Sequence, residues 1–173
     1  MGIRLFAAAF LLTALMGGAA FAQAEAPRSI AIFPVELWDT SGEGSKPGQA
    51  ERLEHATQTL KDQLEQTGRY RAVDLSPYGE RIAKTEPRYN CNGCWEPIAK
   101  EAGATYALLA AVHKVSSLIS SVDIYIMDLA TDKPVAYASG QFRGDDEQAY
   151  TRAMKFLVKE RLIPSETEAP AKP

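Results

Sequence analysis

Cys91 and Cys94, separated by Asn92 and Gly93, are the residues of this 173-residue chain whose types and spacing could do redox chemistry. Such a pair can form a dithiol whose first thiolate, placed at a helix N-terminus, acts as a nucleophile. It can instead form a local disulfide, which is expected in an oxidising compartment and constrains the unfolded chain by only about 2 kcal/mol. The polar, turn-like residues 84–90 favour the disulfide, because a redox pair of this kind directly follows a long core strand.

Other catalytic, metal and cofactor sites have no support in the sequence. Trp95 stands where haem attachment would need a histidine, and neither His55 nor His113 lies at a metal-ligand spacing to the cysteines. The Gly-rich segment 42–48 fits neither the dinucleotide nor the nucleotide phosphate loop, so we interpret it as a flexible connector. We therefore expect no catalytic residue, no metal ion and no cofactor.

The N-terminal residues 1–24 predict a cleavable secretory signal peptide. Arg4 precedes an apolar run from Leu5 to Met16, and small residues lead to cleavage after Ala24, or alternatively after Ala22. The run is too short to span a bilayer, so we expect no stable membrane insertion after cleavage. The full chain carries a net charge of −3, and loss of Arg4 makes the mature chain about −4, which argues against nucleic-acid binding. The predicted location is the periplasm.

Residues 25–164 have the length and composition of a single domain, whereas the Pro-, Ala-, Glu- and Lys-rich residues 165–173 predict a disordered tail. Continuous or alternating apolar residues predict five strands. In the first strand Pro34 requires a sheet edge or a bulge, because proline has no N–H to donate. The expected strands are Ser29–Leu37, Tyr70–Leu75, Thr105–Val115, Val122–Ile126 and Val135–Phe142.

Apolar residues at helical spacing predict helices between these strands. A long helix is expected from Pro47 to Gly68, two short helices from Pro77 to Lys84 and from Pro97 to Ala102, and a closing helix capped by Asp145. We expect helices to cover Tyr125 and Met127 as well. The element order predicts an α/β (α+β mixed) domain with a mixed five-stranded sheet, C-terminal antiparallel hairpins and packed helices. The two apolar stripes are Leu53, Ala56, Leu60 and Leu64, and Tyr150, Ala153, Met154 and Leu157.

Several of these segments also resemble known families. Residues 30–34, with the hairpin of residues 103–108 and 122–131, resemble the amino-terminal domain of TolB and a related domain of curli-secretion lipoproteins, although Asp132 stands where glycine is usual. Asp39-Thr40, residues 89–94 and residues 114–116 resemble a family of short secreted bacterial proteins of unknown function. The resemblance implies a fold and an envelope location, and it brings no catalytic residues.

Aromatic and polar residues near the loops form a candidate rim for a partner or ligand. We predict a secreted, non-enzymatic binding or accessory protein of the periplasm that contacts an envelope protein. The alternatives are a thiol–disulfide accessory protein that uses Cys91 and Cys94, and a small-ligand carrier that uses the loop 39–46. The candidate rim residues are Trp38, Asp39, Thr40, Tyr89, Asn90 and Trp95.

Overall fold

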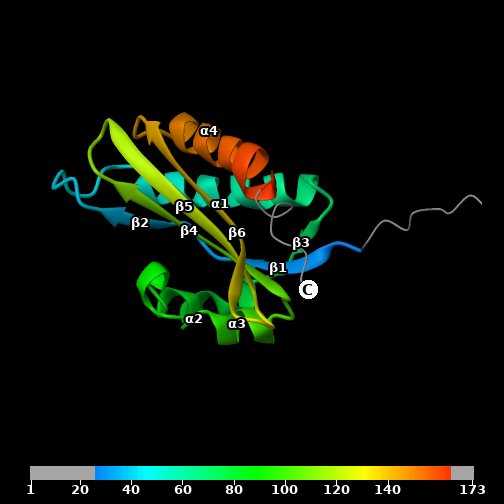
Figure 1. Ribbon diagram of the computed structural model, residues 1–173. Coiled ribbons are helices and arrows are strands. Elements are labelled where there is room, and N and C mark those ends of the chain that lie inside the picture. Colours follow the sequence, from blue (N-terminus) through cyan, green and yellow to red (C-terminus); the bar gives the residue numbers. More distant parts are fainter. Residues whose placement is uncertain (1–25, 165–173) are drawn as a thin grey trace, which may run out of the picture.

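The computed structural model describes residues 26–164, so the expected signal peptide 1–24 and the tail 165–173 lie outside the described residues. The described part forms a mixed α/β domain, with one sheet between two groups of helices (Figure 1). Within it, no helix combines the length and the apolar character that crossing a bilayer requires.

The sheet has the strand order β3-β1-β4-β5-β6, and β2 also pairs with β4. The early strands β1, β2 and β3 run parallel to their neighbours, whereas β4, β5 and β6 form the two expected antiparallel hairpins. The bounds are Arg28–Ile32 (β1), Glu36–Asp39 (β2), Tyr70–Ala72 (β3), Tyr106–Lys114 (β4), Ile119–Asp128 (β5) and Lys133–Arg143 (β6).

The first expected strand is in fact two strands, which makes the sheet six-stranded rather than five-stranded. Pro34 interrupts the ladder because it has no N–H. The N–H of Phe33 still donates to Leu108 on β4 at 3.1 Å, but the N–H of Val35 turns to the hydroxyl of Thr57 at 2.9 Å. Pairing with β4 resumes at Glu36, so β1 and β2 lie end to end along the same edge of β4.

Two long helices cover one face of the sheet and two short ones lie on the other (Figure 1). On the first face, α1 (Gln49–Gln66) packs beside α4 (Glu147–Leu157), which continues as the π-helical turn η3 (Val158–Leu162). The second face carries α2 and α3, with the 3-10 turns η1 and η2. These last elements span Gly79–Ala83 (α2), Glu96–Glu101 (α3), Ser76–Tyr78 (η1) and Arg88–Asn90 (η2).

The expected cap of the closing helix is wrong by one residue. Asp146, not Asp145, is the N-cap, and its carboxylate accepts the N–H of Ala149 at 2.8 Å. Asp145 instead lies 2.8 Å from the buried ammonium of Lys114. A tertiary ion pair therefore decides which of two adjacent aspartates caps the helix.

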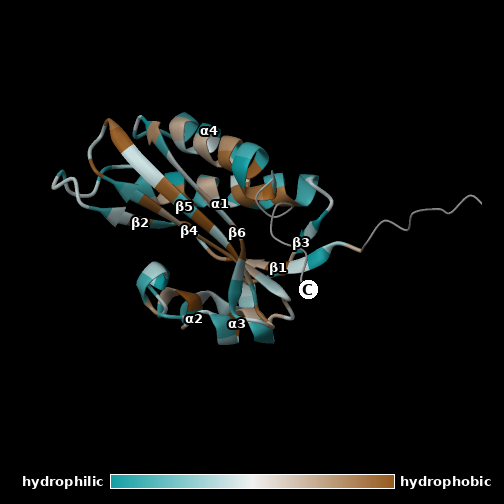
Figure 2. Cartoon of the chain, viewed as in Figure 1, coloured by the Kyte–Doolittle hydropathy of each residue, from teal (hydrophilic) through white to brown (hydrophobic). Residues whose placement is uncertain are grey.

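The sheet separates two hydrophobic cores, and Figure 2 shows hydrophobic residues concentrated in its central strands. The larger core lies under α1 and α4 and includes most of the two predicted stripes, although Ala153 and Leu53 are only partly buried. The smaller core lies under α2 and α3. Its buried members are Ala31, Phe33, Ile82, Trp95, Ile98, Ala99, Ala104, Ala107 and Leu129.

Candidate functional site: an aromatic cleft on the half-covered face of the sheet

The helices α2 and α3 are five and six residues long, too short to cover the whole second face of the sheet. Side chains alternate between the two faces of a strand, so Leu109, Ala111 and His113 of β4 share this face with Asp123 and Tyr125 of β5. Beyond the small core they line an open cleft of about 350 Å³. The cleft is the candidate functional site.

One wall of the cleft is a stack of three rings. Trp38 of β2 stacks on His113 of β4 with ring centroids 4.0 Å apart and planes 18° apart, as their pairing in the sheet dictates. The ring of Tyr89 lies 6.1 Å from that of Trp38. Nε2 of His113 is 2.8 Å from the hydroxyl of Thr40, which fixes the orientation of the imidazole. Trp38 and Tyr89 are each 48% exposed, so their faces are available to a partner.

On the opposite side Tyr125 of β5 contacts Tyr137 of β6, with ring centroids 4.7 Å apart. The hydroxyl of Tyr137 donates a 2.7 Å hydrogen bond to the carboxylate of Asp123, which raises the pKa of Tyr137. The expectation that helices cover Tyr125 is wrong, since this side chain is 40% exposed. Met127, two residues further along β5, does pack against the smaller core, as does Leu109 of β4.

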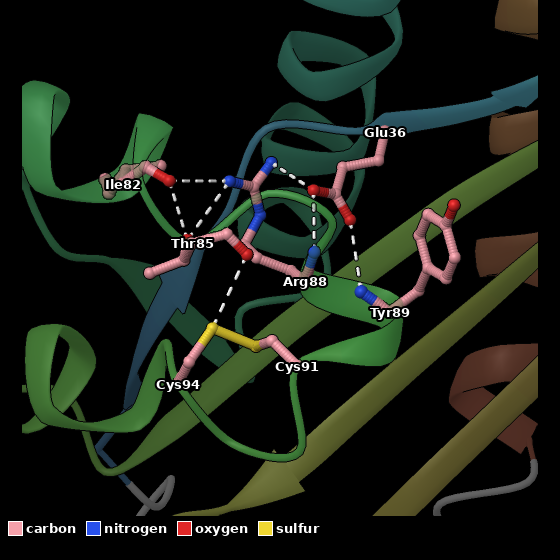
Figure 3. The surroundings of a disulfide bond; sticks show 7 residues. All are labelled: Glu36, Ile82, Thr85, Arg88, Tyr89, Cys91 and Cys94. Atoms are coloured by element: carbon pink, nitrogen blue, oxygen red, sulfur yellow. Dashed lines mark hydrogen bonds and ion pairs between the residues drawn. A yellow bond between two sulfur atoms is a disulfide. The ribbon is translucent and has the colours of Figure 1, made fainter.

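The base of the first wall is a buried ion pair between Glu36 and Arg88 (Figure 3). Glu36 accepts the backbone N–H groups of Arg88 and Tyr89 at 2.9 and 3.2 Å, so its carboxylate fixes the turn that presents the Tyr89 ring. The guanidinium of Arg88 lies 3.2 Å from Glu36 and donates to the carbonyls of Ile82 and Pro34. This ion pair ties β2 to α2 and η2.

Cys91 and Cys94 form a disulfide in the exposed loop that follows Arg88 and Tyr89 (Figure 3). The Sγ atom of Cys94 contacts the carbonyl oxygen of Thr85 at 3.4 Å. The loop joins the Tyr89 turn to Trp95, which is buried edge-on against Phe33 at 5.9 Å. Both cysteines precede the first residue of α3, Glu96, so neither lies within the helix. In this arrangement the disulfide closes the loop that connects the cleft wall to the small core.

The structure brings together only part of the predicted rim. Trp38, Tyr89 and Trp95 line the cleft, although Trp95 is buried rather than loop-exposed. Thr40 contributes indirectly, through its contact with His113. Asn90 is exposed in η2 and does not line the cleft. Asp39 lies towards the Lys114 ammonium, at 4.0 Å, and takes no part in the cleft.

Sequence reasoning missed a buried charge cluster around Lys114, at the far end of β4. The Lys114 ammonium is fully buried and lies 2.8 Å from Asp145 and 3.5 Å from Glu43. The contact with Asp145 raises the pKa of Lys114. Hydrogen bonds from Lys46 and from the N–H of Ser117 lower the pKa of Glu43 to about 2. The Gly-rich loop is thus anchored through Glu43 and is more than a flexible connector.

The described residues hold no cluster of histidine, cysteine and carboxylate side chains that could bind a metal ion. The polar groups of the cleft are engaged with one another: Glu36 with Arg88, Asp123 with Tyr137, and His113 with Thr40. Their arrangement offers stacking surfaces and hydrogen-bonding groups to a bound molecule.

The chain belongs to the family described as "Protein of unknown function (DUF2380)", which matches residues 28–162. Comparison with curated proteins finds no match. Among solved structures, the LpoB C-terminal domain from Salmonella enterica is similar, with 16% identity, a TM-score of 0.50, and coverage of 69% of this chain and 85% of that one. The LpoB C-terminal domain from Escherichia coli is 18% identical, with a TM-score of 0.50 and coverage of 69% and 84%. These similarities show a shared fold.

Proposed function

We propose that this protein is an exported, non-enzymatic accessory protein of the periplasm whose aromatic cleft docks a protein of the cell envelope. The observation that carries the proposal is the gathering of exposed apolar side chains on one surface. Eight large hydrophobic side chains are exposed in residues 26–164, and seven of them lie at the cleft or at the tip of the β4–β5 hairpin next to it. These seven are Trp38, Tyr89, Val115, Leu118, Ile119, Tyr125 and Tyr137.

The hairpin tip extends the cleft because of the alternation of side chains along the strands. Val115 lies two residues after His113, and Ile119 lies two residues before Ser121, so both side chains lie on the face of the sheet that carries the cleft. Leu118, at the turn, is 70% exposed. Contiguous apolar and aromatic surface of this kind is typical of protein–protein contact sites, where tyrosine and tryptophan supply much of the binding energy.

Export is part of the proposal and is supported by residues 1–24, which have the charge, apolar run and small residues of a signal peptide. The disulfide between Cys91 and Cys94 agrees with an oxidising compartment. The TolB-like character suggested by the sequence motifs is a further, finer proposal. N-terminal sequencing of the protein from the envelope fraction tests export: a mature chain that begins at Glu25, or at Gln23, supports it, and an intact N-terminus in the cytosol refutes it.

Docking is tested by placing a photo-crosslinking amino acid at Tyr125, at Leu118, or at the exposed control position Glu54 on α1. We expect a discrete adduct with one envelope protein from Tyr125 and Leu118, none from Glu54, and loss of the adduct when Trp38→Asp is added. Equal adducts at all three positions, or none at any, would refute docking at the cleft.

The competing function, thiol–disulfide exchange, draws on the exposure of Cys94 on the loop. The Cys94→Ser variant removes the resolving thiol and would trap a mixed disulfide between Cys91 and a substrate protein, and the Cys91→Ser variant tests the exposed Cys94 sulfur in the same way. We assign the pair a structural role, because the loop it closes holds Tyr89 relative to Trp95, and we therefore expect no trapped mixed disulfide on non-reducing gels of the envelope fraction. A trapped partner would favour the redox function instead.

A further inference from the structure

The free edge of β6 and the adjacent face of α4 enclose a second groove, on the side of the sheet away from the cleft. The groove has a volume of about 310 Å³ and is lined by the consecutive residues 140–143 of β6. On α4 it is lined by Ala149, Arg152, Ala153 and Phe156, which recur at helical spacing on one face. Figure 1 shows α4 lying along the β6 side of the sheet.

β6 ends the strand order, so within residues 26–164 no strand pairs with its outer edge. The N–H of Gly144 donates to the carbonyl of Leu118, on the β5 side. In an antiparallel strand the N–H and C=O groups of one residue point to the same side, and those of the next residue point to the other side. Since Gly144 bonds to the β5 side, the N–H and C=O groups of Ser139, Gln141 and Arg143 point away from β5, to the free edge. The carbonyl of Ser139 accordingly receives a donor from outside the sheet, Nη1 of Arg161 at 3.5 Å. The edge therefore offers a row of backbone donors and acceptors along the groove.

Three arginines line the same groove: Arg152 on α4 and Arg161 on η3 lie on its helical side, and Arg143 lies at its β6 edge, with its side chain on the face of the strand that carries the cleft. All three are exposed, and none pairs with a carboxylate of the described residues; Arg152 and Arg161 contact only Gln148 and the Ser139 carbonyl, at 3.4 and 3.5 Å. This concentration of unpaired positive charge stands out in a chain whose net charge is −3. Arginine binds carboxylates in a well-defined, often bidentate geometry.

We propose that this groove binds an extended, acidic segment of a partner protein, which adds to β6 as a further strand and pairs its carboxylates with Arg152 and Arg161, on the side of the added strand that faces α4 and η3. Strand addition to a free edge gives affinity through main-chain hydrogen bonds, and side-chain pockets give specificity. Phe156, 54% exposed, supplies an apolar contact beside the added strand. This surface is distinct from the aromatic cleft, and the inference goes beyond the docking function proposed for that cleft.

The test measures binding of a fluorescent ten-residue peptide of alternating Glu and Thr to the mature protein, with the matching Lys–Thr peptide as control. We expect only the acidic peptide to bind, with an affinity that falls as salt rises. Arg152→Glu should weaken binding about tenfold, because it replaces an attraction with a repulsion, and the matched variant Lys155→Glu should not, since Lys155 lies on α4 outside the groove.

Gln141→Pro separates strand addition from simple charge attraction. The N–H of Gln141 points away from β5 and does not take part in the pairing with β5. Proline at this position therefore leaves the sheet intact but removes a donor from the free edge. We expect this variant to lose peptide binding with an unchanged circular dichroism spectrum. Binding that survives Gln141→Pro, or an absence of binding to the wild-type protein, would overturn the proposal.

Three other outcomes would also overturn it by naming a different occupant or role. If a chain ending at Pro164 binds the peptide at least tenfold more tightly, the groove belongs to the chain's own residues 165–173. If the wild-type protein is a dimer that Arg152→Glu dissociates, the occupant is a second copy. If Arg152→Glu instead causes self-association while peptide binding persists, the arginines serve to protect the edge from aggregation.

Discussion

Replacing Arg88 by methionine tests whether the buried ion pair holds the cleft wall. Arg88 is 3% exposed, and its guanidinium contacts five groups. These are the carboxylates of Glu36 and Glu86 at 3.2 and 3.6 Å, the carbonyls of Ile82 and Pro34 at 3.0 and 3.1 Å, and the Thr85 hydroxyl at 3.4 Å. Methionine fills part of the volume but donates nothing. The buried carboxylate then keeps only its two backbone donors, and the Pro34 carbonyl loses its donor, whereas the Ile82 carbonyl keeps the N–H and the hydroxyl of Thr85.

Removing one member of a buried ion pair typically costs about 3–5 kcal/mol, because a buried charge is left without compensation. For a domain of this size each kcal/mol lowers Tm by about 2–4 °C, so we expect Arg88→Met to lower Tm by roughly 6–20 °C. The free energy of unfolding should fall by a similar 3–5 kcal/mol in urea titrations. The variant should also weaken crosslinking from the cleft, because Glu36 no longer has a fixed position from which to hold the Tyr89 turn.

Arg81→Met is the matched control. Arg81 contacts Glu101 at 2.6 Å, but both side chains are about half exposed, and surface ion pairs contribute about 0–1 kcal/mol. In a double-mutant cycle, Glu36→Met combined with Arg88→Met should cost less than the two single changes added together, since no unpaired charge remains. If Arg88→Met lowers the free energy of unfolding no more than Arg81→Met does, the conclusion that Arg88 stabilises the cleft wall is refuted.

Three further changes test other parts of the structure. Cys91→Ser with Cys94→Ser should lower the free energy of unfolding by about 2 kcal/mol, and added reductant should lower the wild-type stability equally but leave the variant unaffected. Gly140→Ala should destabilise by about 1–3 kcal/mol in urea, because its Cβ would lie 2.9 Å from a methyl carbon of Leu157. The lowered pKa of Glu43 means that its folded-state contacts are present above pH 4.5 and are lost as the pH falls towards about 2, which amide exchange of the 40–48 loop would detect.

A specific result would contradict each of these three predictions. Reductant sensitivity that persists without Cys91 and Cys94 would mean that the disulfide is not its cause. Gly79→Ala is the control for Gly140, because nothing lies within 4 Å of its Cβ position and its backbone is helical; equal losses would exclude the steric explanation. Glu43→Gln should abolish the acid-dependent change in the loop, and an unchanged pH profile would show that another group titrates.

The sequence contained enough information for the elements whose patterns are local. The long helix and the closing helix follow from apolar residues at helical spacing, and β4 follows from its nearly continuous apolar run. Pro34 indicated a disturbance in the first strand. Pro34 could not indicate that the next N–H, that of Val35, donates a hydrogen bond to the Thr57 hydroxyl on α1, because that contact depends on how the helix packs against the sheet.

The candidate site was only partly predictable for the same reason. Trp38 and Tyr89 stand out as aromatic residues near loops, but Tyr125 and Tyr137 lie inside strands, where burial is the ordinary outcome. Their exposure depends on how far α2 and α3 extend over the sheet. The buried Lys114 cluster likewise depends on register, which places Asp39 beside Lys114 although 74 residues separate them in the chain.

The position of β4 between all its neighbours limits how this chain can change in length. One edge of β4 is divided between β1 and β2, the other is taken by β5, and its side chains alternate between two separate cores. Inserting or deleting one residue within 106–114 would exchange the side chains that point to the two faces of the sheet. Val112 or Lys114 would then point into the cleft, and His113 would point into the larger core. Among relatives, we expect insertions to accumulate at the hairpin turn and in the 40–48 loop, while the spacing within this strand stays constant.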